Sequence, residues 1–335
     1  MAVEDLRRVV VLSDCHFGEE GALLSRADVV EGLLTEMRQL GDIDRLVLLG
    51  DIWDLWRAGF PAAAGAGAVF FQALAAWGGP RETVLVVGNH DSHLWACFEE
   101  ARRRREMGWR ETDAGRGLAR DRGAGERISP VISPVEGLEL RVRYPLLSLE
   151  VGGKAVLCMH GHHLDFFSRS FWWAKTSWLA RGVLRRSRGR ALSDVDRLNR
   201  PFFELLTHTA HVPELRAWEY RFYGLLRFLA RLLGFQSRSG GSPRRYTSVG
   251  ENAGEAVDLL RDFLPGYIPD LFVFGHTHRA GLGRIRVGGR GVLMANTGCW
   301  LDGSGDETGM TYLVIDDEVR LRRLADWEVT ATGAS

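Results

Sequence analysis

The sequence is poor in cysteine, almost without lysine and without net charge, and the first and last of these shortages argue against particular classes of protein. Its four cysteines are scattered and form no CxxC pair, which argues against a disulfide framework and favours a reduced, cytoplasmic setting. Lysine occurs only at Lys154 and Lys175, so arginine supplies nearly all of the basic side chains. The formal net charge is zero, so no overall field draws the chain toward nucleic acid or anionic lipid.

Long hydrophobic runs are also missing. No uninterrupted apolar stretch approaches the roughly 18 residues that suggest a membrane span. Near the N-terminus, a short apolar run follows two acidic residues and stops at Ser13 and Asp14, unlike a signal peptide. We therefore expect a soluble, cytoplasmic protein, and peripheral contact with the inner face of a membrane stays open.

Short apolar runs recur along the chain, and most of them end in a polar cluster. Runs of four or five apolar residues bounded by turn formers are typical of buried strands. We predict strands at residues 9–12, 46–49, 84–87, 155–159, 271–274 and 292–295, with an antiparallel finish at about 310–315 and 319–324. Helical patterns at roughly 24–40 and 66–77 separate the first three runs, and this alternation predicts an α/β fold.

Two segments depart from the alternation. Residues 110–127 are rich in Gly, Arg, Asp and Glu, which predicts a flexible loop. Residues 164–250 form a long insertion that is mostly helical in pattern and dense in aromatic side chains.

The polar clusters at the strand ends contain metal-binding residue types. Taken singly, each Asp or His is more often a turn, cap or core residue, but five clusters in order at strand ends are hard to explain as caps. Mixed imidazole and carboxylate donors suit divalent Mn, Fe or Zn. Two such ions about 3.5–4 Å apart can clamp the attacking and leaving oxygens of a phosphoryl displacement. The clusters contain Asp14, His16, Asp51, Asn89, His90, His160, His276 and His278.

These clusters resemble the motif series of the calcineurin-like metallophosphoesterase superfamily. The series reads D-x-H, G-D-x-x-D, G-N-H-D, a later His before Gly, and G-H-x-H, and it covers residues 14–278 in that order. The resemblance implies a four-layer α/β/β/α sandwich of two mixed sheets, with two metals at its upper edge. The catalytic domain would comprise residues 1–163 and 251–330, and residues 164–250 would form a helical cap.

The resemblance also implies a role for each metal ligand. Asp14, His16 and His278 would hold the first metal, and Asn89, His160 and His276 would hold the second. The carboxylate of Asp51 would bridge the two ions. The implied nucleophile is a water or hydroxide held by both ions.

Three further residues receive catalytic roles from the same resemblance. His90 would stabilise the phosphate and protonate the leaving oxygen. Asp91 would orient His90, and Asp54 would support the site in the same way. The turn at residues 296–299 is similar to the one that closes the family's site, although a plain strand end explains it equally well.

The insertion is the best guide to the substrate. It opens with six aromatic side chains between Phe166 and Trp178, and a basic amphipathic helix is predicted at about 216–233. One interpretation is a lid whose apolar faces pack inward. The other is an acyl-chain groove or an interfacial helix whose arginines meet lipid phosphates.

The arrangement is similar to the UDP-2,3-diacylglucosamine pyrophosphatase branch of the superfamily. This chain has His90 where that enzyme has Arg, and His162 where that enzyme has Asp in an H-G-D motif. The sequence therefore favours a hydrolase of a phosphodiester or pyrophosphate, with a lipid-linked substrate at the membrane surface as the finer hypothesis.

Two alternatives stay open at this point. A soluble phosphatase or phosphodiesterase would act on nucleotides or phosphoproteins, with the insertion as a plain lid. A non-catalytic scaffold is disfavoured by the intact ligand set. Nucleic acid is not an expected partner because acidic residues accompany the arginine clusters, and no obligate protein partner is evident.

Overall fold

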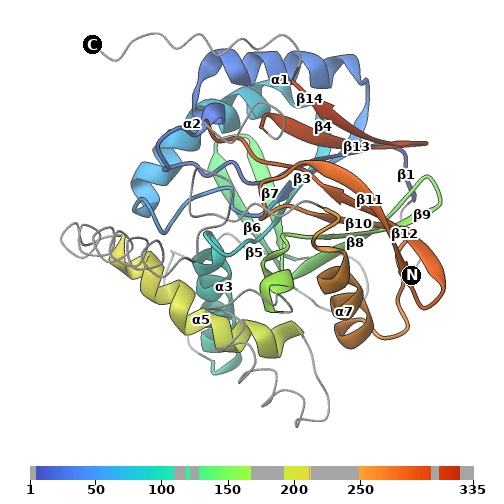
Figure 1. Cartoon of the computed structure of the whole chain (residues 1–335). Helices are drawn as coiled ribbons and strands as arrows, with labels where there is room; N and C mark the ends of the chain where they lie inside the picture. The colour runs from blue at the N-terminus through green and yellow to red at the C-terminus, as the bar shows by residue number, and fades with distance from the viewer. Residues whose placement is uncertain are drawn as a thin grey trace, which may run out of the picture.

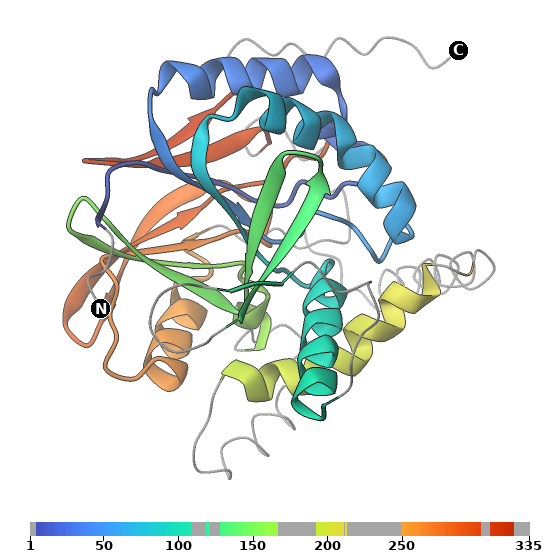
Figure 2. The ribbon, with the colours of Figure 1, turned by 180° about the vertical axis from the view of Figure 1, so that it is seen from behind.

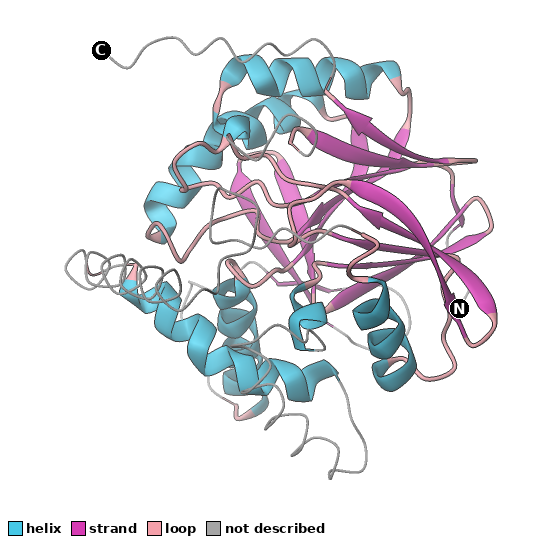
Figure 3. Cartoon of the chain, viewed as in Figure 1, coloured by secondary structure: helices cyan, strands magenta, loops and turns pink. Residues whose placement is uncertain are grey.

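Two mixed β-sheets pack face to face, and helices cover both outer faces, in the computed structural model of the chain (Figure 1). The structure describes residues 5–108, 118–120, 128–166, 192–210, 212, 249–302 and 309–324. The predicted four-layer α/β/β/α sandwich is therefore confirmed, and Figure 3 shows the helices outside the two sheets.

The larger sheet has a parallel centre flanked by antiparallel strands. Strands β2, β3, β4 and β7 run parallel. In spatial order the sheet contains β14 (Val319–Arg323), β13 (Thr311–Ile315), β2 (Val9–Leu12), β3 (Ile43–Leu49), β4 (Pro80–Val86), β7 (Leu138–Arg143), β6 (Ile128–Val135) and β5 (Leu118–Arg120).

The smaller sheet also has a parallel centre, formed by β9, β10 and β12. Its spatial order is β1 (Asp5–Leu6), β8 (Leu146–Val151), β9 (Lys154–Met159), β10 (Leu271–Phe274), β12 (Arg290–Asn296) and β11 (Gly281–Val287). Every strand predicted from an apolar run is present in one of the two sheets.

Side-chain alternation explains why the strands are apolar throughout. On β2, Val9 and Val11 pack between the two sheets, whereas Val10 and Leu12 pack beneath the helices of the larger sheet. On β10, Phe272 packs beneath the helix on the smaller sheet. Strands buried on both faces lack the apolar–polar alternation of a half-exposed sheet, which accounts for the continuous apolar runs.

Helices α1 (Ala27–Gln39) and α2 (Phe60–Trp77) cover the larger sheet, and α7 (Ala253–Phe263) covers the smaller one. The predicted helix at 66–77 is the second part of α2. The helix begins earlier because Pro61 occupies its first turn, where a missing N–H does no harm. By length and composition, α2 is apolar enough to cross a membrane, but Phe70 and Phe71 pack in the core.

Helices α3 (Ser92–Glu106) and α5 (Leu192–Thr209) lie together below the sheet edge (Figure 2). Two ion pairs join them: Glu204 Oε2 lies 2.7 Å from His93 Nδ1, and Arg200 Nη2 lies 2.5 Å from Glu99 Oε2. Short 3₁₀ helices η1 (Leu23–Ser25) and η2 (His162–Phe166) complete the described elements.

The two irregular segments have different outcomes. The prediction of a loop at 110–127 is wrong for residues 118–120, which form β5 because β6 offers them a partner strand; the rest of that segment lies outside the described residues. Within the insertion, α5 is helical as predicted. The aromatic stretch after Phe166 and the helix predicted at 216–233 lie outside the described residues.

Candidate metal centre

All of the predicted ligands lie at one edge of the sandwich. Strands β2, β3 and β4 run parallel and end there, as do β9 and β10 of the other sheet. The loops that follow these strands are joined by backbone hydrogen bonds, because Asp14 N donates to Gly50 O at 3.0 Å and His16 N to Asp51 O at 2.9 Å. The strand ends therefore bring residues from 14 to 278 into one site.

Several ligand residues adopt a backbone conformation that L-amino acids rarely use. Apart from glycine, only one described residue outside this group, Met310, has a positive φ. Such a conformation costs free energy and is found where a site requires it. Here it turns the side chain into the centre directly after the strand. The residues are Asp14, His16, Asp51, His276 and His278, with φ between 50° and 64°.

The glycines of the motifs provide the space that the carboxylates need. A Cβ at Gly88 would collide with the carboxylate of Asp51, and a Cβ at Gly275 would collide with that of Asp14. Glycine therefore allows the two loops to pass directly over the acidic side chains.

The first ligand set gathers around Asp14. His278 Nε2 lies 3.1 Å from Asp14 Oδ1 and 3.1 Å from His16 Nε2, while His16 Nε2 lies 3.9 Å from Asp14 Oδ1. Ligand atoms of all three residues lie within 4.8 Å of one another. One carboxylate and two imidazoles at these separations can hold a divalent ion.

The second ligand set gathers around His160. Its Nδ1 donates to Leu49 O at 2.9 Å, and its Nε2 lies 3.1 Å from both Asp51 Oδ2 and Asn89 Oδ1. Ligand atoms of Asp51, His160 and His276 lie within 4.8 Å of one another. Asp51 Oδ2 is also 3.9 Å from His16 of the first set, so this carboxylate lies between the two sets.

The electrostatics of the centre fit a pair of cations. Burial alone would raise the pKa of Asp51, but His160 and His90 outweigh it and hold that pKa well below its usual range. Burial opposes the charge of His160, whereas Asp51 and Asp14 raise its pKa to about 9. In the metal-free protein, a proton on His160 thus neutralises Asp51. Divalent ions would replace such protons and bind the same imidazole nitrogens and carboxylate oxygens, so the residues present fit two ions.

Asp54 orients the imidazole rings of His16 and His90. His16 Nδ1 donates to Asp54 Oδ2 at 2.9 Å and His90 Nδ1 to Asp54 Oδ1 at 2.8 Å. With both Nδ1 atoms engaged, each ring presents Nε2 to the centre. Burial opposes its charge, but His90 and His16 lower the pKa of Asp54 well below its usual range.

Asp91 does not have the predicted contact. Its carboxylate accepts hydrogen bonds from Gly88 N at 2.6 Å and Ile52 N at 2.9 Å, whereas the carboxylate that orients the His90 ring is that of Asp54, 2.8 Å from His90 Nδ1. The reason is that Asp91 directly precedes α3, and its carboxylate points back toward the loops that follow β3 and β4. By accepting a hydrogen bond from each loop, Asp91 holds the two loops together.

Two features of the centre were absent from the sequence-based predictions. Trp56 stacks on His90 with ring centroids 4.0 Å apart, and His162 lies 5.7 Å from His160 by the same measure. Both follow a ligand motif closely, at Asp54 and His160, and their proximity to these motifs is the available sequence signal. The turn at 296–299 supports the centre, because Asn296 Nδ2 donates to Gly275 O at 2.9 Å.

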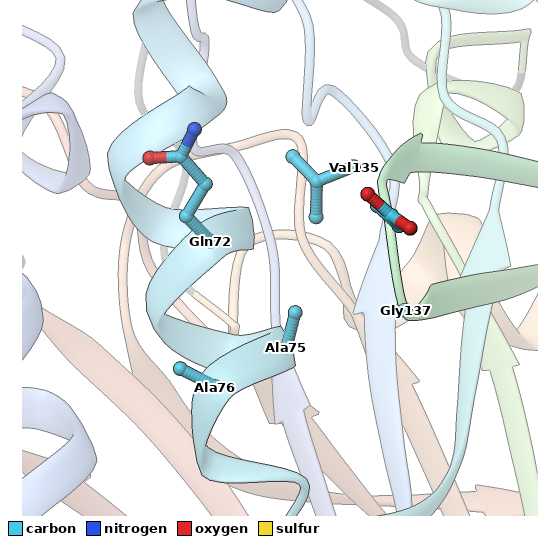
Figure 4. Close-up of a pocket in the computed structure, with 6 residues that line it drawn as sticks. Gln72, Ala75, Ala76, Val135 and Gly137 are labelled. Carbon is cyan, nitrogen blue, oxygen red and sulfur yellow. The ribbon is translucent and has the colours of Figure 1, made fainter.

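A separate hollow lies away from the strand ends, between α2 and the turn that joins β6 to β7 (Figure 4). Its volume is about 400 Å³. The lining consists of Gln72, Ala75, Ala76, Val135, Glu136 and Gly137, which include no imidazole or thiol. This hollow offers no chemistry comparable with that of the metal centre.

A family model and several solved structures match the chain. No curated protein matches the chain. Among solved structures, a dimetal phosphatase from Danio rerio is 14% identical, with 96% of this chain and 97% of that chain covered and a TM-score of 0.40. A metallophosphoesterase from Sphaerobacter thermophilus is 14% identical, with 95% and 88% covered and a TM-score of 0.28. The calcineurin-like phosphoesterase family model matches residues 7–280, so the chain belongs to that family of metal-dependent phosphoester hydrolases.

Proposed function

We propose that this phosphoesterase uses two divalent ions to hydrolyse a phosphodiester or a pyrophosphate. The observation that carries the proposal is the pair of adjoining ligand sets with Asp51 between them and His90 beside them. When bound, the ions supply Lewis acidity and lower the pKa of a water molecule. The ligand assignments given by the family resemblance form part of this proposal.

His90 is the proposed general acid. Its Nδ1 is held by Asp54, its ring stacks on Trp56, and its Nε2 lies 3.9 Å from Asp51 Oδ2. This places one N–H at the edge of the ligand sets, where it can donate a proton to the leaving oxygen. Trp56 shields the ring from water on one face.

Mn is the proposed metal, with Fe or Zn as alternatives, because the donors combine imidazole, carboxylate and amide oxygen. The test is metal analysis after reconstitution, combined with an activity screen of monoester, diester and lipid-pyrophosphate substrates. We expect two ions per chain and hydrolysis of at least one diester or pyrophosphate. A stoichiometry well below two per chain would contradict the assignment.

We further propose that the substrate is lipid-linked and that the protein acts at the inner face of the membrane. The support is the composition of the 164–250 insertion, which we propose to be a cap on the catalytic domain formed by residues 1–163 and 251–330. Its helix α5 reaches the centre, since the Phe203 ring lies 5.5 Å from that of Trp56. The proposed branch is that of the UDP-2,3-diacylglucosamine pyrophosphatases.

The lipid proposal is tested by replacing Arg216, Arg227 and Arg231 together with Gln. Each cationic side chain near an anionic surface contributes about 1 kcal/mol, so vesicle binding should fall by about two orders of magnitude. Hydrolysis of a small soluble diester should hardly change. Equal sedimentation of mutant and parent with vesicles would favour a soluble enzyme that acts on nucleotides or phosphoproteins.

A further inference from the structure

His162 is a buried imidazole without a hydrogen-bond partner among the described residues. His162 is only 5% exposed, and neither Nδ1 nor Nε2 has a hydrogen-bond partner among the described residues. His160, two residues earlier, uses both of its ring nitrogens. Buried polar atoms are nearly always paired, so the partner of His162 comes from outside this part of the chain.

The surroundings of His162 place it at the metal centre. Its ring centroid lies 5.7 Å from that of His160 and 6.3 Å from that of His276. The adjacent faces are occupied by aromatic rings: Tyr144 stacks on it at 6.4 Å, and Phe203 meets it edge-on at 5.9 Å. A polar partner for His162 therefore has to approach from the side of the ligands or through a gap in this aromatic wall.

A row of rings connects His162 with His90. Phe203 contacts both His162, at 5.9 Å, and Trp56, at 5.5 Å, and Trp56 stacks on His90. His90 lies next to the first ligand set, with its ring 4.8 Å from that of His16, whereas His162 lies next to the second set. His90 and His162, neither of which is a predicted ligand, thus stand at opposite ends of one aromatic wall.

A small cavity lies next to the aromatic wall. Tyr144 and Phe203 line it, and its volume of about 10 Å³ is close to that which one water molecule requires. The Oγ of Ser92, another residue that lines the cavity, is buried without a partner among the described residues, so a water there can pair with Ser92. His162 does not line this cavity, and such a water does not account for its two unpaired nitrogens.

We propose that His162 binds the substituent that stays on phosphorus during hydrolysis, which makes it a specificity-determining residue for phosphodiesters and anhydrides. This inference rests on the proposed function. In an in-line displacement the leaving oxygen departs opposite the nucleophile, and His90 is the residue placed to protonate it. The retained substituent points elsewhere, and His162 offers hydrogen bonds on the side of the second ligand set. A monoester carries no retained substituent.

The test measures binding to the metal-loaded protein by calorimetry with two probes that cannot be hydrolysed. Methylenediphosphonate represents an anhydride, and methylphosphonate represents a monoester. His162→Phe keeps a flat ring but removes both nitrogens, so affinity for methylenediphosphonate should fall about tenfold, as expected for one hydrogen bond to a charged group. Affinity for methylphosphonate should stay the same, and His162→Gln should recover part of the loss.

Two controls separate this role from a structural one. His162→Phe removes two unpaired polar atoms from a buried position, so its melting temperature should equal or exceed that of the parent. The neighbouring His163, whose ring lies 4.0 Å from that of His162, should tolerate replacement by Phe without a change in either affinity. Both variants should retain two metal ions.

Three outcomes would overturn the inference. Equal losses for the two probes would make His162 a ligand of a phosphoryl oxygen. Unchanged affinities would show that His162 does not contact the retained substituent, and a parent that fails to bind methylenediphosphonate would lack the subsite. The proposed function fails separately, if the metal-loaded parent hydrolyses neither bis(p-nitrophenyl) phosphate nor any other diester or pyrophosphate.

Discussion

The metal centre and the contact between α3 and α5 both rely on pairs of charged side chains, yet they are built differently. At the centre the partners are almost fully buried, and strained backbone positions orient them. At the helix contact, the side chains of His93 and Glu204 are 33% and 24% exposed and come from regular helices. Half-exposed ion pairs contribute little to stability, whereas an uncompensated buried charge is costly.

The difference indicates which part of the molecule tolerates change. Each buried carboxylate of the centre has several partners, so removing one leaves other groups unpaired. At the contact between α3 and α5, water can hydrogen-bond to a side chain that has lost its partner, because these side chains are already partly exposed to solvent.

Asp51→Asn should have the largest effect. The substitution removes the charge shared by both ligand sets while keeping the shape of the side chain. Metal affinity should fall by more than the roughly 10–100-fold loss caused by removing a group that only supports a ligand. Metal analysis after dialysis would measure the loss of bound metal, and a diester assay would measure the loss of turnover. Retention of two ions and full turnover would show that Asp51 is not the bridge.

His90→Ala should affect turnover alone. Its Nδ1 bonds to Asp54 and it is not among the predicted ligands, so both ions should stay bound. Turnover should fall by about 10²–10⁴, the usual range for a positioned acid–base group. Paired measurements of metal content and kcat separate this variant from Asp51→Asn. Unchanged turnover would refute the role of His90.

Metal affinity should rise with pH. In the metal-free protein the pKa of His160 is raised to about 9, although burial opposes its charge, because Asp51 and Asp14 stabilise its proton. That proton must leave before the imidazole can bind an ion, so affinity should increase by about tenfold per pH unit below pH 9. Titration with Zn²⁺ in buffers at pH 6, 7 and 8 would measure the slope. A flat profile would contradict a charged His160.

Glu204→Gln should have the smallest effect. Hydrogen bonds to Cys97 and Glu204 raise the pKa of His93 to about 10, so the ion pair between His93 and Glu204 is fully present below pH 6.5 and is lost as the pH rises through 10. The ion pair between Arg200 and Glu99 remains. At pH 7 the variant should exchange the amide hydrogens of α5 a few times faster, in keeping with a half-exposed pair.

The control for this variant is Glu100→Gln, because Glu100 pairs with Arg104 of the same helix, at 3.1 Å. It should leave exchange in α5 unchanged. The difference between the variant at position 204 and the parent should shrink as the pH rises above 10. A variant that lost turnover by orders of magnitude would show that α5 contributes to catalysis more strongly than this contact indicates.

The same contrast explains what the sequence could predict. Continuous apolar runs identified the strands of both sheet centres, because those strands are buried on two faces. The edge of the larger sheet that β6 and β5 form was not predicted. β6 contains Pro130 and Pro134, which disfavour a strand, and β5 arises inside a segment whose composition indicates a loop. Pairing at a sheet edge depends on the partner strand rather than on local composition.

At the site, motif order predicted which residues come together, and the structure brings all seven predicted ligands to one edge. Local sequence could not distinguish Asp54 from Asp91 as the partner of His90, because both lie within reach in the motif series. Their roles depend on the direction of the loops, which the structure shows. Trp56 and His162 required the ring contacts to be seen.

The origin of the ligands in both sheets has a consequence for how the protein acquires its metals. Asp14, His16 and Asp51 come from the first fifth of the chain, whereas His276 and His278 come from its last fifth. Neither ligand set exists until the two sheets have packed against each other. During synthesis, the ribosome must therefore release the chain at least as far as His276 before either ligand set can hold an ion. An ion that binds only the finished sandwich then favours it by mass action, which makes the availability of metal in the cell a determinant of how much folded protein accumulates.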